Sequence, residues 1–241
     1  MRFFKPILIL AGLLVPFLVG AQNPVKTLPR NYWLEFENSQ VRVVHVHYDA
    51  KERLPQHDHP KTPTLYVYLG DAGPVRFKHT GANPYALDRP SVKQGGFRLN
   101  PGVLEEHEVE NISDTSADFL RVEFKTIPFK RTTLRGHFPP AQADFWNMTH
   151  PRQIAFDDQN LRITRFGYPP GAKSVLPPAT AETTIDISVR AGEAQLGTKK
   201  ETLHAGEAWA APADSRPVRN IGPNKIEVLR VEWKASARKS T

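Results

Sequence analysis

The chain has 241 residues, of which 39% are hydrophobic and 24% charged, which is typical of a soluble globular protein with a buried core. Its formal net charge of +7 is modest. The densest basic stretches, residues 130–135 and 234–239, lack interleaved aromatic residues, so no nucleic-acid partner is expected. Cysteine is absent, which excludes disulfides, cysteine nucleophiles and thiolate metal sites.

Residues 1–21 have the pattern of a secretory signal peptide. Two basic residues precede an apolar run that ends in Val19-Gly20-Ala21, and we predict cleavage near Ala21–Gln22. The alternative is a retained membrane anchor, but the run is near the lower length limit for a span and contains Pro6 and Pro16. We therefore expect an exported protein, periplasmic or extracellular, with no membrane span after signal removal.

The remainder of the chain is rich in short segments of β-branched and aromatic residues bounded by turn residues, a pattern that predicts strands. In chain order these segments are TLYVYL (64–69), ADFLRVEFK (117–125), LRITRFGY (161–168), TIDISV (184–189) and KIEVLRVEWK (225–234). A short helix is expected at AQADFWN (141–147), within a connector over residues 129–149. The sequence therefore predicts an all-β protein.

The chain also repeats itself. FENSQVRVVHVHY begins at Phe36 and FDDQNLRITRFGY at Phe156, an offset of 120, whereas RVEFK at 121–125 matches RVEWK at 230–234 with an offset of 109. The first copy therefore carries extra residues, which we place in a long hairpin loop within 72–95. Two copies of about 90–100 residues each predict two similar β-sandwiches or barrels in tandem.

One histidine pair suggests metal chemistry. Residues 55–60 read PQHDHP, and in an extended segment His57 and His59 project from the same side. His107, in NPGVLEEHEVEN at 100–111, is the candidate third ligand. Three neutral imidazoles can hold a divalent ion and leave coordination positions open. The alternative is a vestigial site without metal, since a His-x-His alone is most often a pair of exposed histidines without a function.

Other residues are interpreted more simply. The repeat matches Val46 and Tyr48 to apolar residues of the second copy, so His45 and His47 are expected on the opposite face, as ordinary strand residues or at an interface. No partner pattern surrounds the remaining histidines, which are His79, His137, His150 and His204.

The histidines and the residues around them resemble the two motifs of the cupin superfamily, and the repeat resembles a two-domain bicupin. The first motif is Gly, five residues, His-x-His, three or four residues, Glu, six residues and Gly. The second is Gly, five residues and Pro, then His followed by Asn. The matching residues are His57, His59 and Gly70 for the first motif, and Gly95, Pro101, His107 and Asn111 for the second. The resemblance covers residues 31–235 and implies two jelly-roll (double-stranded β-helix) barrels with a metal held inside.

The first copy departs from the family pattern at three places. The spacing from Pro101 to His107 is one residue longer than usual. Lys51 stands at the opening glycine, and Pro63 or Thr64 stands where the glutamate ligand should be. The resemblance therefore implies a site of three histidines. Glu105 lies two residues before His107 and is the candidate replacement for the missing acid.

The second copy departs further. Pro177 and Ala179 occupy the positions of the histidine pair. Asp214, Ser215 and Arg216 surround the third ligand position. Since no imidazole remains there, we predict that this copy binds no metal and is structural or ligand-binding.

The sequence as a whole predicts a signal peptide (1–21), an N-terminal cupin barrel (22–128), the connector (129–149) and a degenerate C-terminal barrel (150–241). The first barrel would hold one divalent transition metal, zinc, iron, copper or nickel, through His57, His59 and His107. The implied activity is that of a small-molecule metalloenzyme of oxygenase or isomerase type, acting on an anionic or enolisable substrate. Glu105 or Tyr66 could act as acid or base, and Tyr66 with Tyr68 could line a pocket or simply be buried aromatics.

The competing hypothesis is a non-catalytic cupin that binds a small molecule or has a structural role. It rests on the missing glutamate of the first copy and the missing histidines of the second. Homodimerisation is left open by the sequence.

Overall fold

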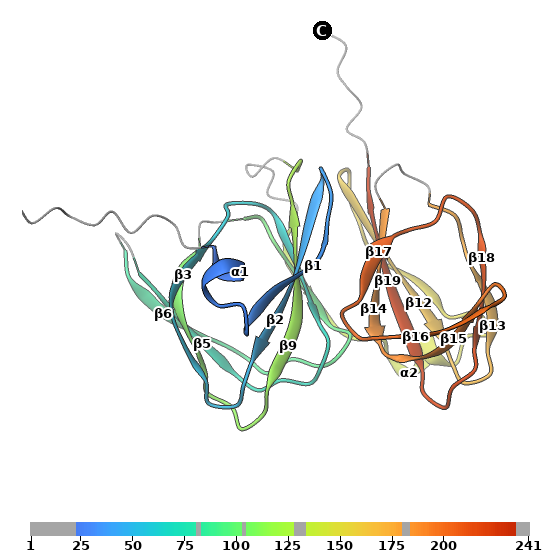
Figure 1. The fold of residues 1–241 in the computed structure, drawn as a ribbon, viewed down its shortest axis with the longest axis horizontal. Helices are drawn as coiled ribbons and strands as arrows, with labels where there is room; N and C mark the ends of the chain where they lie inside the picture. The colour runs from blue at the N-terminus through green and yellow to red at the C-terminus, as the bar shows by residue number, and fades with distance from the viewer. Residues whose placement is uncertain (1–22, 81–82, 103–104, 128–133, 180–183, 235–241) are drawn as a thin grey trace, which may run out of the picture.

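A computed structural model describes residues 23–80, 83–102, 105–127, 134–179 and 184–234 (Figure 1). The predicted signal peptide lies outside these residues. Within the described part, no helix is long and apolar enough to cross a membrane. Two short helices, α1 (Pro24–Thr27) and α2 (Ala143–Trp146), accompany strands that pair antiparallel throughout.

The strands form two groups that lie side by side in Figure 1, blue to green on the left and yellow to red on the right. We call residues 32–138 the N-terminal half and residues 152–233 the C-terminal half. The N-terminal half contains β1 (Tyr32–Glu37), β2 (Val41–Tyr48), β3 (Arg53–His59), β4 (Thr64–Tyr68), β5 (Val75–His79), β6 (Tyr85–Arg89), β7 (Phe97–Asn100), β8 (Glu105–Asn111), β9 (Ala117–Phe124) and β10 (Gly136–Phe138). Its two sheets have the strand orders β1-β2-β9-β4-β7-β10 and β3-β8-β5-β6.

The C-terminal half repeats this arrangement. It contains β11 (Arg152–Asp157), β12 (Leu161–Tyr168), β13 (Lys173–Leu176), β14 (Thr184–Arg190), β15 (Gly192–Leu196), β16 (Lys199–Leu203), β17 (Ala208–Ala210), β18 (Arg216–Asn220) and β19 (Ile226–Trp233). Its sheets have the orders β11-β12-β19-β14-β17 and β13-β18-β15-β16. Each order matches that of the N-terminal half strand for strand, apart from β10. The sequence repeat is therefore a repeat of sheet topology.

The five strands predicted from the sequence are present, as β4, β9, β12, β14 and β19. The short helix expected within 141–147 is α2. Two segments differ from expectation. Residues 72–95, expected as a loop, contain the paired strands β5 and β6, and the predicted connector supplies β10, which pairs with β7 at the edge of the larger N-terminal sheet.

The larger sheets of the two halves pack against each other. One continuous cluster of buried apolar side chains includes Leu120 and Val122 from β9 and Leu229 and Val231 from β19, all fully buried. At its edge the rings of Phe124 and Trp233 meet edge-on, with centroids 5.2 Å apart. Both central strands are buried along most of their length, and apolar residues alternate in them with charged residues that include the buried Arg121 and Arg230.

A buried ionic cluster links the two halves beside this apolar contact. Glu227 on β19 is fully buried and pairs with Arg165 on β12 and with Arg190, whose Nε lies 3.0 Å from the carboxylate. Arg165 also donates to the carbonyl of Gly95 at 2.9 Å, and Arg190 donates to the side chain of Gln94 at 2.6 Å. The loop before β7 is thus fixed to the C-terminal half by charge-assisted hydrogen bonds.

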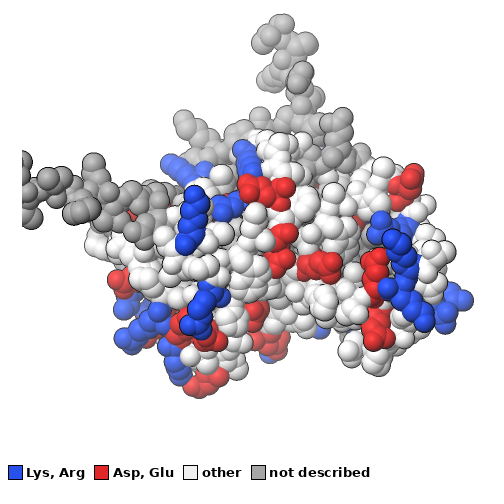
Figure 2. Space-filling model, viewed as in Figure 1, with Lys and Arg blue, Asp and Glu red and all other residues white. Residues whose placement is uncertain are grey.

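Basic and acidic side chains are interspersed over both halves on the face shown in Figure 2. No single-sign patch dominates this face, in agreement with the modest net charge.

Candidate metal centre

Three histidines from two paired strands meet inside the N-terminal half. His57 and His59 lie on β3, and His107 lies on β8, directly opposite His57 in the antiparallel register. Their side chains are buried, with exposed fractions of 2%, 6% and 3%. One ring nitrogen from each lies within 4.8 Å of the others. The structure therefore brings together the three residues that the sequence predicted as ligands.

The hydrogen bonds of His57 fix its tautomer. Its Nδ1 lies 2.9 Å from the carbonyl oxygen of Pro55, which can only accept, so Nδ1 carries the proton. Nε2 is then the acceptor and lies 2.8 Å from the hydroxyl of Tyr32, which in turn lies 2.9 Å from the hydroxyl of Tyr48. A backbone carbonyl behind the ring is the usual partner of a metal-ligating imidazole. Tyr32 competes for the same lone pair that an ion would use.

His59 is held in its neutral form. Burial lowers its pKa well below the usual range, and the positive charge of Arg121 and the neighbouring rings of His107 and His57 lower it further. A neutral imidazole is the metal-binding form of histidine.

The chemistry and the burial of the three imidazoles fit a divalent transition metal. Nitrogens that share one ion at about 2.1 Å lie roughly 3 to 3.5 Å apart. The measured limit of 4.8 Å is somewhat wider, so the rings must draw together to hold an ion.

The acidic fourth ligand of the family motif is replaced by neutral residues here. Thr64 is buried and its hydroxyl donates to the carbonyl of Thr62 at 2.9 Å. Glu105 lies opposite His59 in the β3–β8 register, but its side chain lies outside the described part of the structure. Whether Glu105 completes the site therefore remains a prediction.

A second departure from the motif has a backbone explanation. Lys51, at the motif's opening glycine, has φ of 59°, and Gly171 at the matching place of the second copy has φ of 76°. The turn keeps the left-handed conformation that favours glycine, although a lysine occupies it. The lysine side chain donates to the carbonyl of Ile112 at 2.9 Å.

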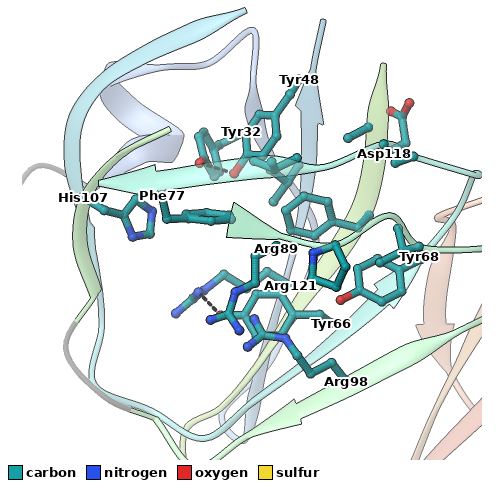
Figure 3. Close-up of a pocket in the computed structure, with 18 of the residues that line it drawn as sticks. Tyr32, Tyr48, Tyr66, Tyr68, Phe77, Arg89, Arg98, His107, Asp118 and Arg121 are labelled. Carbon is teal, nitrogen blue, oxygen red and sulfur yellow. Dashed lines mark hydrogen bonds between the residues drawn. The ribbon is translucent and has the colours of Figure 1, made fainter. Parts of the chain in front are cut away.

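A pocket opens beside the three histidines (Figure 3). His59 and His107 lie in its wall, together with Tyr66 and Tyr68, for which burial as core or interface aromatics was the favoured interpretation. Tyr66 is both buried and part of the pocket wall. The apolar part of the wall comes from Val46, Ala72, Val75, Phe77, Val92 and Phe119. Its charged lining groups are Arg89, Arg98, Arg121 and Asp118.

Sequence reasoning missed these four charged residues. In the sequence, Arg121 was noted only for its match to Arg230 in the repeat. Asp118 lies 2.8 Å from Nδ1 of His47 and 3.6 Å from Nε2 of His45. Neither histidine joins the three-histidine cluster, as the repeat predicted.

In the C-terminal half an arginine stands where the metal site would be. Arg230, the counterpart of Arg121, donates to both oxygens of Asp186, at 2.8 and 2.9 Å, and to the carbonyl of Pro177. Pro177 is the residue at the position of His57. The guanidinium is therefore bonded to the residue that corresponds to His57, and none of the described residues of this half forms a histidine cluster.

No family model and no curated protein matches the sequence. Solved structures do match the fold. AerE from Microcystis aeruginosa is 13% identical, with a TM-score of 0.54 over 85% of this chain and 97% of that chain. The protein YhaK from Escherichia coli is 9% identical, with a TM-score of 0.55 over 86% and 95%. The bacterial pirin YhhW from Escherichia coli, solved in complex with nickel(II), is 16% identical, with a TM-score of 0.56 over 83% and 90%.

At these identities the matches bear on the fold alone. The paired antiparallel sheets and the matched structures show that the chain has the cupin fold, as the two sequence motifs implied.

Proposed function

We propose that the protein is a metal-dependent cupin that binds one divalent transition metal through His57, His59 and His107 and acts on a small molecule in the adjoining pocket. The observation that carries the proposal is the convergence of three buried imidazoles, one of them held neutral, on the wall of that pocket. The neutral imidazole is the form of histidine that binds a metal ion.

The chain's own residues would prepare the site in two ways. Pro55 holds the ring of His57 with its Nε2 lone pair directed inward, and burial keeps His59 neutral. A bound zinc, iron, copper or nickel ion would supply Lewis-acid or oxygen-activating chemistry. The reaction would be of oxygenase or isomerase type. Tyr66, within the pocket, is a candidate for handling a proton.

The wider organisation is part of the proposal. The repeated sheet order supports two cupin barrels in tandem, of which the second, filled by Arg230, binds no metal. The pattern of residues 1–21 supports export to the periplasm or the extracellular space. Amino-terminal sequencing of the protein from its native host should find Gln22 as the first residue, and an intact Met1 would contradict export by this route.

A second function, a non-catalytic cupin with a vestigial site, is favoured by the neutral residues at the glutamate position and by the hydrogen bond of Tyr32 to His57. Elemental analysis separates the two. The metal-dependent reading predicts about one transition metal per chain, lost in His57→Ala/His59→Ala and kept in the exposed control His150→Ala/His204→Ala. A folded protein that stays metal-free after incubation with each of the four ions would support the vestigial site.

A further inference from the structure

The smaller sheet of the C-terminal half has an outer face that is open to solvent. This sheet, β13-β18-β15-β16, lies at the end of the molecule away from the N-terminal half (Figure 1). Its inner face carries buried apolar side chains, which are Leu176, Ala194, Leu203 and Val218. Since side chains alternate between the two faces of a strand, Lys173, Arg219 and Lys200 project outward, and all three are exposed. Figure 2 shows basic side chains gathered over this end of the molecule, with acidic ones beside them.

These three cations lie in one row across the sheet. Lys173 on β13 is directly opposite Arg219 on β18. Arg219 is in turn opposite Gln195 on β15, and Gln195 is opposite Lys200 on β16. Neighbouring strands lie about 4.8 Å apart, so the row spans about 14 Å. Among the residues that the structure describes, no acidic side chain pairs with any of the three cations.

The N-terminal half shows that the fold does not require such a row. The sheet orders of the two halves match, so the strand registers make Arg53, Glu110, Arg76 and Asp88 the equivalent row in β3-β8-β5-β6. There the charges alternate and are paired, with Arg53 2.8 Å from Glu110 and Arg76 2.7 Å from Asp88. In the C-terminal row a cation stands at the place of each acid. Like charges directly opposite each other destabilise a sheet, so this row keeps its charge at a cost in stability.

The rest of the outer face adds apolar surface and one acid. Val175, two residues from Lys173, is 51% exposed and lies opposite the exposed Pro217. Glu193 is the one acid among the strand residues of this face. These four strands contain no aromatic residue, so the face offers no platform on which bases could stack. A row of cations therefore lies beside a small exposed apolar strip.

We propose that this face docks the protein on an anionic lipid surface. The negative charge of lipid headgroups complements the cation row and attracts it within a Debye length of the bilayer. Val175, beside the row, would enter the boundary between headgroups and acyl chains and add apolar burial. The metal centre lies in the other half of the molecule, so the failure of either proposal leaves the other standing.

Co-sedimentation with lipid vesicles tests the proposal. The protein used begins at Gln22, so that the apolar residues 1–21 do not themselves bind lipid. It should bind vesicles of phosphatidylcholine mixed with phosphatidylglycerol, should not bind vesicles of phosphatidylcholine alone, and should be released by high salt. No binding to the mixed vesicles, or equal binding to both kinds, would overturn the proposal.

A triple variant locates the surface. Each basic residue near an anionic bilayer strengthens binding about fivefold. Lys173→Gln/Arg219→Gln/Lys200→Gln should therefore weaken binding to the mixed vesicles at least tenfold. Unchanged binding would show that the cation row is not the docking surface.

The matched control removes the same charge from the equivalent sheet of the N-terminal half. Arg53→Gln/Arg76→Gln/Lys78→Gln changes three cations on the outer face of β3 and β5. This variant should bind the mixed vesicles within about threefold of the wild type, because its residues lie outside the docking face. If it loses as much binding as the first variant, the attraction comes from net charge and the proposal is wrong.

Dextran sulfate, a soluble linear polyanion, separates a lipid surface from a charged polymer. Val175→Asn should weaken vesicle binding at least twofold and leave the binding of dextran sulfate unchanged, because only the bilayer offers an apolar layer to this side chain. Tight binding of dextran sulfate, together with vesicle binding that Val175→Asn does not change, would assign the face to a polyanion and overturn the lipid proposal.

Discussion

The buried carboxylate between the two halves offers the sharpest stability prediction. Glu227 is fully buried and pairs with Arg165 and Arg190. Burial lowers the pKa of Arg165, and Glu227 raises it part of the way back. Glu227→Gln keeps the shape of the side chain but removes its charge. Arg165 would then keep only neutral acceptors, the carbonyls of Gly95 at 2.9 Å and Pro139 at 3.2 Å.

Removing one partner of a buried ion pair costs about 3 to 5 kcal/mol, because the other charge remains buried without compensation. Arg190 is 29% exposed at its side chain and can turn to water, whereas Arg165 is 2% exposed and cannot. We therefore expect the unfolding free energy to fall by about 3 kcal/mol or more. Most of the cost arises at Arg165.

Urea unfolding followed by tryptophan fluorescence measures this change. The control is Asp88→Asn, which breaks the exposed pair with Arg76 and should cost at most about 1 kcal/mol. A loss for Glu227→Gln no larger than that of the control would refute the reasoning, since it would mean that Arg165 reaches solvent.

Three further predictions concern the site and its supports. Tyr32→Phe removes the hydroxyl that competes for the Nε2 lone pair of His57. Metal affinity, measured by chelator competition, should therefore rise about two- to tenfold. A fall in affinity would mean that the Tyr32 hydroxyl helps to position His57 for the metal. Gly102→Ala places a Cβ 2.3 Å from the backbone of Thr62, at a residue with φ of 90°. Its melting temperature in thermal unfolding should fall far more than that of Gly197→Asn, whose Cβ would meet open space. His47→Gln should cost more stability in urea at about pH 5.5 than at about pH 8.5, and an equal loss at both would contradict the pairing with Asp118.

The sign of the last prediction follows from the shift of His47. Burial alone would lower its pKa, but hydrogen bonds to Asp118 and Asp49 outweigh burial and raise it above 6.5. The ionisable groups around this cluster also include His45 and Glu35, and Arg30 and Glu52 beside Asp49. A raised folded-state pKa means that the stabilisation is fully present below the unfolded pKa and is lost as pH rises through the folded value.

Much of the fold could be predicted because corresponding strands of the two halves have similar sequences. β12 and β19 are covered on both faces, so their sequences are dense in apolar residues and match β2 and β9 of the first copy. The histidine trio could be predicted because β3 and β8 carry it at fixed motif spacing. β5 and β6 were expected as a loop because glycine, proline and asparagine around them outweighed the short strand signals.

The pocket charges could not be predicted from local pattern. Arg98 and Arg121 lie on different strands, and only the pairing of β4 with β7 and β9 brings them to Tyr66. β10 was missed for a similar reason, since three residues acquire a strand conformation only by pairing with β7. The positions of these arginines and the strand β10 depend on tertiary contacts, which the short-range periodicity of the sequence does not indicate.

The central claim is that three histidines of the N-terminal half hold one metal ion. Crystals grown from metal-loaded protein, with diffraction data collected at the absorption edge of that metal, test it most directly. We predict one anomalous peak per chain, within about 2.0 to 2.2 Å of a ring nitrogen of His57, His59 and His107, and none beside Arg230. A metal-loaded protein whose anomalous peak lies elsewhere, or whose three rings surround no peak, would contradict the account.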